Sequence, residues 1–205
     1  MSYAESAMFC LYDDDVSVVD LRSGHHSSSQ SIKSEGQEDE EPVVCFCLHP
    51  SKDEIVLATR KGLLHHVDLT TRQRYRTIKA HQMPILAMCY DPTGTLVATG
   101  AADRSIRVWD ILGGFCTHSF RDHTEIIRTL RFHPDPTKLL LVSCADDASV
   151  RVFDLKAQKC VSTYRNHSSL PTSVAFSEDG GLMASSGRDK VTTFIGWHVN
   201  DCTHP

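Results

Sequence analysis

The chain has no apolar run that approaches the roughly 18 residues a membrane helix needs. Its N-terminus, MSYAESAMFCLYDDD, lacks a basic segment and meets three aspartates where a signal peptide would stay apolar. It also has no CxxC pair among its eight cysteines. We therefore expect no membrane partner and no secretory route, and we expect reduced, mostly buried thiols in place of disulfides.

The sequence also lacks a strong charge of one sign, because its net charge is only −5. Residues 1–41 hold ten acidic and two basic side chains, and the acidity is strongest in EGQEDEE, residues 35–41. The remaining residues hold sixteen acidic and nineteen basic side chains. This balance argues against a protein that coats nucleic acid by charge alone. Residues 23–41 are expected to form a solvated loop; the alternatives are phosphorylation or a basic partner.

What the sequence does contain is an internal repeat of about 43 residues. A hydrophobic–Asp–hydrophobic triplet occurs four times, at residues 19–21, 67–69, 109–111 and 153–155. Three histidines that precede these units, His81, His123 and His167, are spaced by 42 and 44 residues. Each period holds short runs of strand-forming residues that are separated by turn residues. The pattern predicts an all-β protein of four-stranded units, and a helical solenoid of similar period is disfavoured.

One unit, TLVATGAADRSIRVWDI preceded by Ala80 and His81, resembles a WD40 repeat. In that family a loop His, a strand Ser or Thr, a turn Asp and a strand Trp form a hydrogen-bonded tetrad. The resemblance implies a partial WD40 β-propeller of about four blades of four antiparallel strands, which is a fragment of a seven-bladed ring. It places the tetrads at His81, Thr99, Asp103, Trp109; at His123, Ser143, Asp147, Phe153; and at His167, Ser185, Asp189, with Ile195 in place of Trp.

The repeat also divides the chain into segments. After Lys190 the sequence leaves the pattern, so we expect a fragment, a truncated isoform or a gene model that reads into an intron, and hence a marginally stable protein. The predicted segments are 1–22, a partial first blade; 23–41, an acidic, Ser-rich inter-blade loop; 42–79, a degenerate blade; 80–122 and 123–166, two WD blades; 167–195, a truncated blade; and 196–205, a tail outside the repeat.

His81, Thr99 and Asp103 have the composition of a nucleophile–base–orienter set. A set that recurs once per repeat indicates structure, because a buried His that bridges Asp and Ser or Thr satisfies groups that would each cost about 1–3 kcal/mol if left unpaired. Phe153 supports this interpretation, since it keeps the ring and loses the indole donor. We therefore predict no enzyme, no catalytic residue and no cofactor.

A metal site is conceivable at Cys45, Cys47 and His49, which alternation along a predicted strand would place on one face. No further Cys pair completes a zinc set, and small side chains on that face suit packing between blades. We predict no metal site.

Three arginines alternate along TTRQRYRTIKAH on the predicted outer strand of the degenerate blade. Charges on an edge strand block unwanted strand pairing. The alternative is a contact with phosphates or with an acidic partner. These residues are Arg72, Arg74 and Arg76.

Within the family, three stretches are similar to a WD-repeat subunit of the UTP-B complex of the small-subunit processome: YDPTGTLVATGAADRSIRVWDI, FHPDPTKLLLVSCADDASVRVFDL and VAFSEDGGLMASSGRDK. The resemblance implies a non-catalytic scaffold in ribosome biogenesis that is located in the nucleus and nucleolus. It implies other WD-repeat proteins of UTP-B as partners, and support of pre-18S rRNA processing with the U3 small nucleolar RNP. Pre-rRNA would be met mainly through protein neighbours, and no small-molecule substrate is implied.

Two other functions stay open. One is a cytoplasmic signalling or trafficking scaffold. The other is a ubiquitin-ligase substrate adaptor, a class that often carries Arg two residues after the repeat Asp. Of the four residues at that position, only Arg22 qualifies; the others are Thr70, Leu112 and Lys156.

Overall fold

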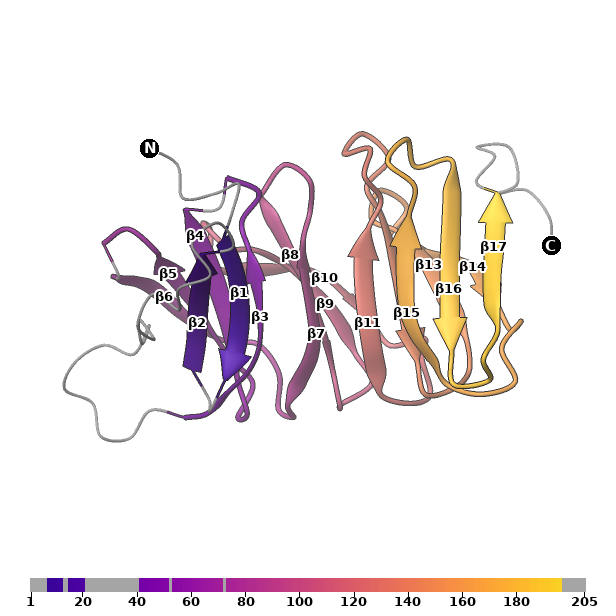
Figure 1. The fold of residues 1–205 in the computed structure, drawn as a ribbon, viewed down its shortest axis with the longest axis horizontal. Helices are drawn as coiled ribbons and strands as arrows, with labels where there is room; N and C mark the ends of the chain where they lie inside the picture. The colour runs from indigo at the N-terminus through magenta and orange to yellow at the C-terminus, as the bar shows by residue number, and fades with distance from the viewer. Residues whose placement is uncertain (1–6, 13–14, 21–40, 52, 72, 197–205) are drawn as a thin grey trace. The chain divides into compact units, whose positions relative to one another are not determined.

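The computed structural model describes residues 7–12, 15–20, 41–51, 53–71 and 73–196. All regular structure in these residues is β-strand, arranged in five antiparallel sheets (Figure 1). The predicted all-β class is confirmed. No helix of the described residues is long and apolar enough to cross a membrane. Residues 1–6, 13–14, 21–40, 52, 72 and 197–205 lie outside the description, and they include all of the predicted acidic loop except Glu41 and most of the tail.

The chain divides into two compact units, Met1–Pro84 and Ile85–Pro205. The first unit holds a two-stranded sheet and a four-stranded sheet. Ile55, Leu57 and Val67 form the buried core of the larger sheet. The strands are β1 (Ala7–Tyr12) and β2 (Asp15–Asp20), then, in spatial order, β3 (Val43–Leu48), β4 (Glu54–Thr59), β5 (Leu63–Asp68) and β6 (Arg74–Lys79).

The second unit holds two four-stranded sheets and one three-stranded sheet, each a simple meander in chain order. The first is formed by β7 (Ile85–Tyr90), β8 (Leu96–Ala101), β9 (Ile106–Asp110) and β10 (Phe115–Phe120). The second is formed by β11 (Ile127–Phe132), β12 (Leu140–Ala145), β13 (Val150–Asp154) and β14 (Lys159–Tyr164). The third is formed by β15 (Pro171–Phe176), β16 (Leu182–Gly187) and β17 (Thr192–Gly196).

The repeat extends to irregular features of the backbone. The turn between the second and third strands of each larger sheet places one residue in the left-handed region, where Gly is favoured. In the first of these sheets the residue is Gly62, with φ of 78°. In the other three it is Arg104, Ala148 or Lys190, with φ between 61° and 66°. The first two strands of each of these four sheets also share a register shift at the same place, typical of a β-bulge. It lies between Val43/Cys45, Ile85/Ala87, Ile127/Thr129 and Pro171/Ser173.

In the second unit, successive sheets pack face to face. Small residues of β7 and β8 form one cluster with large aliphatic side chains of β11, among them Ile127 and Leu130. The approach is close, because a Cβ atom on Gly100 would lie 2.4 Å from Cγ2 of Ile127. The next pair of sheets packs Val142 and Val152 with Val174 and Met183. Each of the first two sheets therefore depends on contact with the sheet that follows it to bury one of its faces.

No disulfide joins the cysteines whose side chains the structure describes. Burial raises the pKa of the Cys89 and Cys144 thiols to about 12. The expectation of burial is wrong for Cys116, which is exposed on β10. The side chains of Cys10 and Cys202 lie outside the description.

Replacement of Gly100 by Ala should destabilise the second unit by about 1–3 kcal/mol, because the new methyl group would overlap the buried Ile127 side chain. The sign of this change in stability is informative, since Gly→Ala at an unstrained site usually stabilises a protein by lowering the conformational entropy of the unfolded chain. Urea unfolding would measure the change. Gly113→Ala is the matched control: its methyl group would meet the exposed Phe115 ring, which can move into solvent. Equal effects of both substitutions would contradict the packing argument.

Candidate functional site

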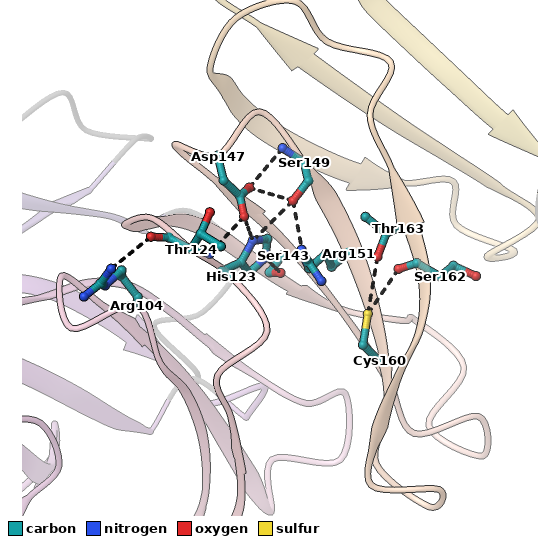
Figure 2. Close-up of polar contacts among 10 residues, drawn as sticks. All are labelled: Arg104, His123, Thr124, Ser143, Asp147, Ser149, Arg151, Cys160, Ser162 and Thr163. Atoms are coloured by element: carbon teal, nitrogen blue, oxygen red, sulfur yellow. Dashed lines mark hydrogen bonds and ion pairs between the residues drawn. The ribbon is translucent and has the colours of Figure 1, made fainter.

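The predicted polar set of the second repeat comes together around His123 (Figure 2). His123 lies in the loop between β10 and β11, Ser143 lies on β12, and Asp147 lies in the turn between β12 and β13. The His123 Nδ1 atom is 2.9 Å from Asp147 Oδ2, and its Nε2 atom is 2.6 Å from Ser143 Oγ. His123 and Ser143 are only 4% and 0% exposed. The three side chains form one buried, connected network.

Further donors extend this network in both directions. The hydroxyl of Ser149 donates to Asp147 Oδ1 over 2.6 Å, and Arg151 Nε donates to Ser149 Oγ over 3.3 Å. The backbone N–H of Thr124 donates to Asp147 Oδ2 over 3.2 Å. Arg104, from the turn between β8 and β9, donates to the Thr124 carbonyl oxygen over 3.2 Å (Figure 2). The network therefore links the turn of one sheet to the loop that starts the next.

The electrostatics follow from burial and from these hydrogen bonds. Burial lowers the pKa of His123 and outweighs the opposite effect of Asp147, so the ring is neutral near pH 7. Burial alone would raise the pKa of Asp147, but hydrogen bonds from Ser149, His123 and the Thr124 N–H hold it at about 2. A neutral His beside an ionised Asp is the state that this network stabilises.

The third repeat contains the same arrangement. The His167 Nδ1 atom is 3.0 Å from Asp189 Oδ2, and its Nε2 atom is 2.9 Å from Ser185 Oγ. The backbone N–H of Ser168 donates to Asp189 over 3.0 Å, as that of Thr124 does to Asp147. Ile195, at the position of the missing Trp, packs on the apolar cluster of Val152 and Met183.

The first predicted tetrad is divided between the two units. His81 belongs to the first unit and is 1% exposed. In the second unit, the indole Nε1–H of Trp109 donates to Thr99 Oγ1 over 3.0 Å, and Asp103 accepts from the Ser105 hydroxyl over 2.6 Å. Phe153 occupies the position of Trp109 in the next sheet, where its ring centroid is 4.7 Å from that of Phe120.

These networks resemble a Ser–His–Asp triad in composition and in hydrogen-bond order. A nucleophile must reach its substrate, and the Ser143 side chain is fully buried, while Ser185 is 2% exposed. The network also occurs twice in equivalent places. The arrangement can stabilise loops and sheet contacts, but it presents no reactive hydroxyl to a bound molecule.

The other predicted residues lie on the four-stranded sheet of the first unit. Arg74 and Arg76 are exposed on the edge strand β6, and Arg72 lies outside the description. His49 follows the end of β3, where its Nδ1 accepts from the Ser51 N–H over 3.1 Å. Strand alternation therefore does not place His49 with Cys45 and Cys47. In the described part of the chain, no group of three or more His, Cys, Asp or Glu side chains could hold a metal ion.

Two polar pairs were not predicted from the sequence. His66, which is 3% exposed, has its Nε2 2.7 Å from Glu54 Oε2, at positions where the next two repeats have Val and Leu. Arg128 binds Asp146 through two nitrogens, with Nε 2.9 Å from Oδ1 and Nη2 2.6 Å from Oδ2. Both pairs become visible when the repeats are aligned by position, because the paired residues differ in charge or polarity from the residues at the equivalent positions of the other repeats.

The stability of the second unit should fall in two pH windows. Since the pKa of His123 is lower in the folded state than in the unfolded chain, its contribution is complete above about pH 6.5 and is lost as the pH falls below that value. The Asp147 contribution is lost between about pH 4 and pH 2. Urea unfolding at a series of pH values would measure both.

Two variants separate these windows. His123→Asn should flatten the upper window, and Asp147→Asn should flatten the lower one while it weakens the fold by about 1–3 kcal/mol near neutral pH. An unchanged slope above pH 5 in His123→Asn would show that His123 is not buried in its neutral form.

Comparison with known proteins identifies the repeats. The model of the WD domain, G-beta repeat, matches residues 72–110, 114–154 and 158–194. The chain is 41% identical to human transducin beta-like protein 3 over 196 residues, which is 95% of this chain and 23% of that protein. It is 32% identical to U3 small nucleolar RNA-associated protein 13 of Saccharomyces cerevisiae over 58% of this chain and 14% of that protein. It is 30% identical to cell division control protein 4 of the same yeast over 42% of this chain.

The chain thus spans about a quarter of the length of human transducin beta-like protein 3. The family match covers more than half of the chain, and it falls on the sheets that carry the His–Ser–Asp networks. The predicted fold class, that of partial propeller blades, is confirmed, and the chain belongs to the WD40-repeat family.

Proposed function

We propose that this protein is a non-catalytic WD-repeat scaffold of ribosome biogenesis. In this role it is a component of the small-subunit processome that supports pre-18S rRNA processing together with the U3 small nucleolar RNP. Its partners are other WD-repeat proteins of the UTP-B complex, it meets pre-rRNA mainly through them, and it acts in the nucleolus. The observation that carries the proposal is 41% identity to human transducin beta-like protein 3 over 95% of the chain.

A second relative supports the same assignment. The name of the yeast protein that is 32% identical associates it with U3 small nucleolar RNA. The similarity to the human protein covers 95% of the chain and therefore includes the propeller blades.

The buried networks support a role without chemistry. The WD40 family consists mostly of non-catalytic scaffolds, and a fold of this kind supports many unrelated binding functions. The one arrangement that resembles a catalytic triad has its hydroxyl groups buried at Ser143 and Ser185. In this proposal the His–Ser–Asp sets hold the blades, as the predicted tetrads imply, and the segments 42–79, 80–122, 123–166 and 167–195 act as successive blades.

Affinity capture of the tagged chain from nuclear extract would test the function. We expect enrichment of U3 RNA and of other WD-repeat subunits of the processome over a capture with the tag alone. Recovery of cytosolic trafficking or signalling proteins, or of ubiquitin-ligase subunits, with U3 RNA at background, would contradict the proposal.

Within this function, we assign a partner contact to the arginines of the outer strand of residues 42–79, namely Arg72, Arg74 and Arg76. Arg74 and Arg76 are exposed along an edge strand that also carries Lys79. The equivalent strands of the next two sheets, β10 and β14, hold one Lys between them. A cationic edge that the other blades lack suits an acidic or phosphate-bearing partner better than it suits a general device against strand pairing.

Arg74→Glu together with Arg76→Glu should lower the recovery of U3 RNA in the same capture by about threefold or more, since each exposed ion pair lost costs up to about 1 kcal/mol. Lys156→Glu with Lys159→Glu, also exposed, makes the same change of charge on another sheet and should leave recovery unchanged. Equal recovery with the arginine variant and the wild type would remove these residues from the interface.

A further inference from the structure

Two loops at one end of the last described sheet form one surface, which we call the β15–β16 loop edge. It consists of residues 165–170, which lead into β15, and residues 187–191, which lead from β16 to β17. Pro171 pairs with Gly187, so both loops lie at the same edge of the sheet. The Arg188 N–H donates to the Leu170 carbonyl oxygen over 2.9 Å, and the Ser168 N–H donates to Asp189 Oδ2 over 3.0 Å. The two loops are therefore fixed against each other by backbone contacts.

This edge presents only positive charge to solvent. Arg165, Arg188 and Lys190 are exposed, and none of their side chains has a hydrogen-bond or ion-pair partner among the described residues. The one acid of the edge, Asp189, has a side chain that is 4% exposed. Its carboxylate is occupied by His167 and by the N–H groups of Ser168 and Val191. Three cations thus point outward without an exposed counter-charge.

The preceding sheet has the same framework with different charges. Its loops, residues 121–126 and 146–149, hold His123 and Asp147 in the same arrangement as His167 and Asp189. At three equivalent positions, however, it has acids where the β15–β16 loop edge has none: Asp122 for Asn166, Glu125 for Ser169 and Asp146 for Arg188. Arg165 has a counterpart in Arg121, but Arg188 and Lys190 correspond to Asp146 and Ala148. Since both sets of loops adopt one framework, these two cations are not required for folding.

The position of Lys190 points the same way. Its φ is 62°, in the left-handed region that favours Gly, and the equivalent residue in the first unit is Gly62. The equivalent turns hold Arg104 and Ala148 in the same conformation, so this backbone position accepts different side chains and does not require a lysine.

We propose that the β15–β16 loop edge binds a short acidic segment of a protein partner. Arginine pairs with carboxylates through two hydrogen bonds, and Val191, which is 45% exposed next to Lys190, offers an apolar contact beside the charges. A nucleic acid fits less well, because its continuing phosphate chain would meet the exposed Asp122 and Glu125 of the adjacent edge. The site goes beyond the proposed function and would hold for a scaffold in any assembly.

Fluorescence anisotropy with the full chain tests the proposal. The probe is a labelled peptide of alternating Glu and Ser, with a Gln–Ser peptide and an oligouridine of equal length as comparisons. Arg188→Asp with Lys190→Ala copies the turn Asp146–Ala148 of the preceding sheet, so the fold has a precedent for it. We expect this variant to bind the Glu–Ser peptide about tenfold more weakly than the wild type at low salt.

Lys156→Ala with Lys159→Asp is the control, since it makes the same charge change near the turn where Asp154 pairs with Lys159, at the opposite edge of the neighbouring sheet. Its affinity for the peptide should match the wild type. Equal weakening in both variants, tighter binding of oligouridine than of the peptide, or no peptide binding by the wild type would each overturn the proposal. If the first variant is less stable to urea, Arg188→Ala with Lys190→Gly repeats the test with the residue that the first unit uses at this turn.

Discussion

Face-to-face packing of successive sheets is the constraint on which the second unit depends. A four-stranded antiparallel sheet has two faces, and burial of apolar side chains is the main source of its stability. Here Gly100 and its small neighbours leave room for Ile127 and Leu130, so small residues on one face and large ones on the other allow the close approach of these two sheets. The next pair of sheets packs Val142 and Val152 against Val174 and Met183.

The polar networks depend on this packing and support it in return. Once two sheets are in contact, the loop that joins them is covered, and its polar groups need partners inside the protein. His123 and His167 meet that need by bridging a buried Ser to an Asp that also accepts backbone N–H groups of the loop. The result resembles a catalytic triad because both arrangements orient a His between an acid and a hydroxyl. Access to the hydroxyl distinguishes them.

Much of this architecture could be predicted because the same residue pattern recurs in successive repeats. The strands follow from the spacing of the repeat, and the His–Ser–Asp sets follow from its resemblance to the WD40 repeat, since each repeat must satisfy the same packing and the same hydrogen bonds. The exposure of Cys116 and the location of His49 beyond its strand could not be predicted, because they depend on where one strand ends and on what covers it. The Glu54–His66 pair is missed because a repeat pattern directs attention to what recurs.

The Glu54–His66 pair departs from the repeat, and such departures are where a specific function is expected in a repeat protein. Positions that recur, such as His123 and His167, are determined by the fold and carry little information about partners. Positions that share a backbone site but differ in charge, such as Asp146 and Arg188, are free of that constraint, because both residues fit one turn. Asp146 pairs with Arg128 of its own sheet, whereas the Arg188 side chain has no such partner among the described residues, so contact with a partner is the reason proposed for Arg188. In a chain built from one repeated solution, the departures from the repeat therefore carry the information about binding.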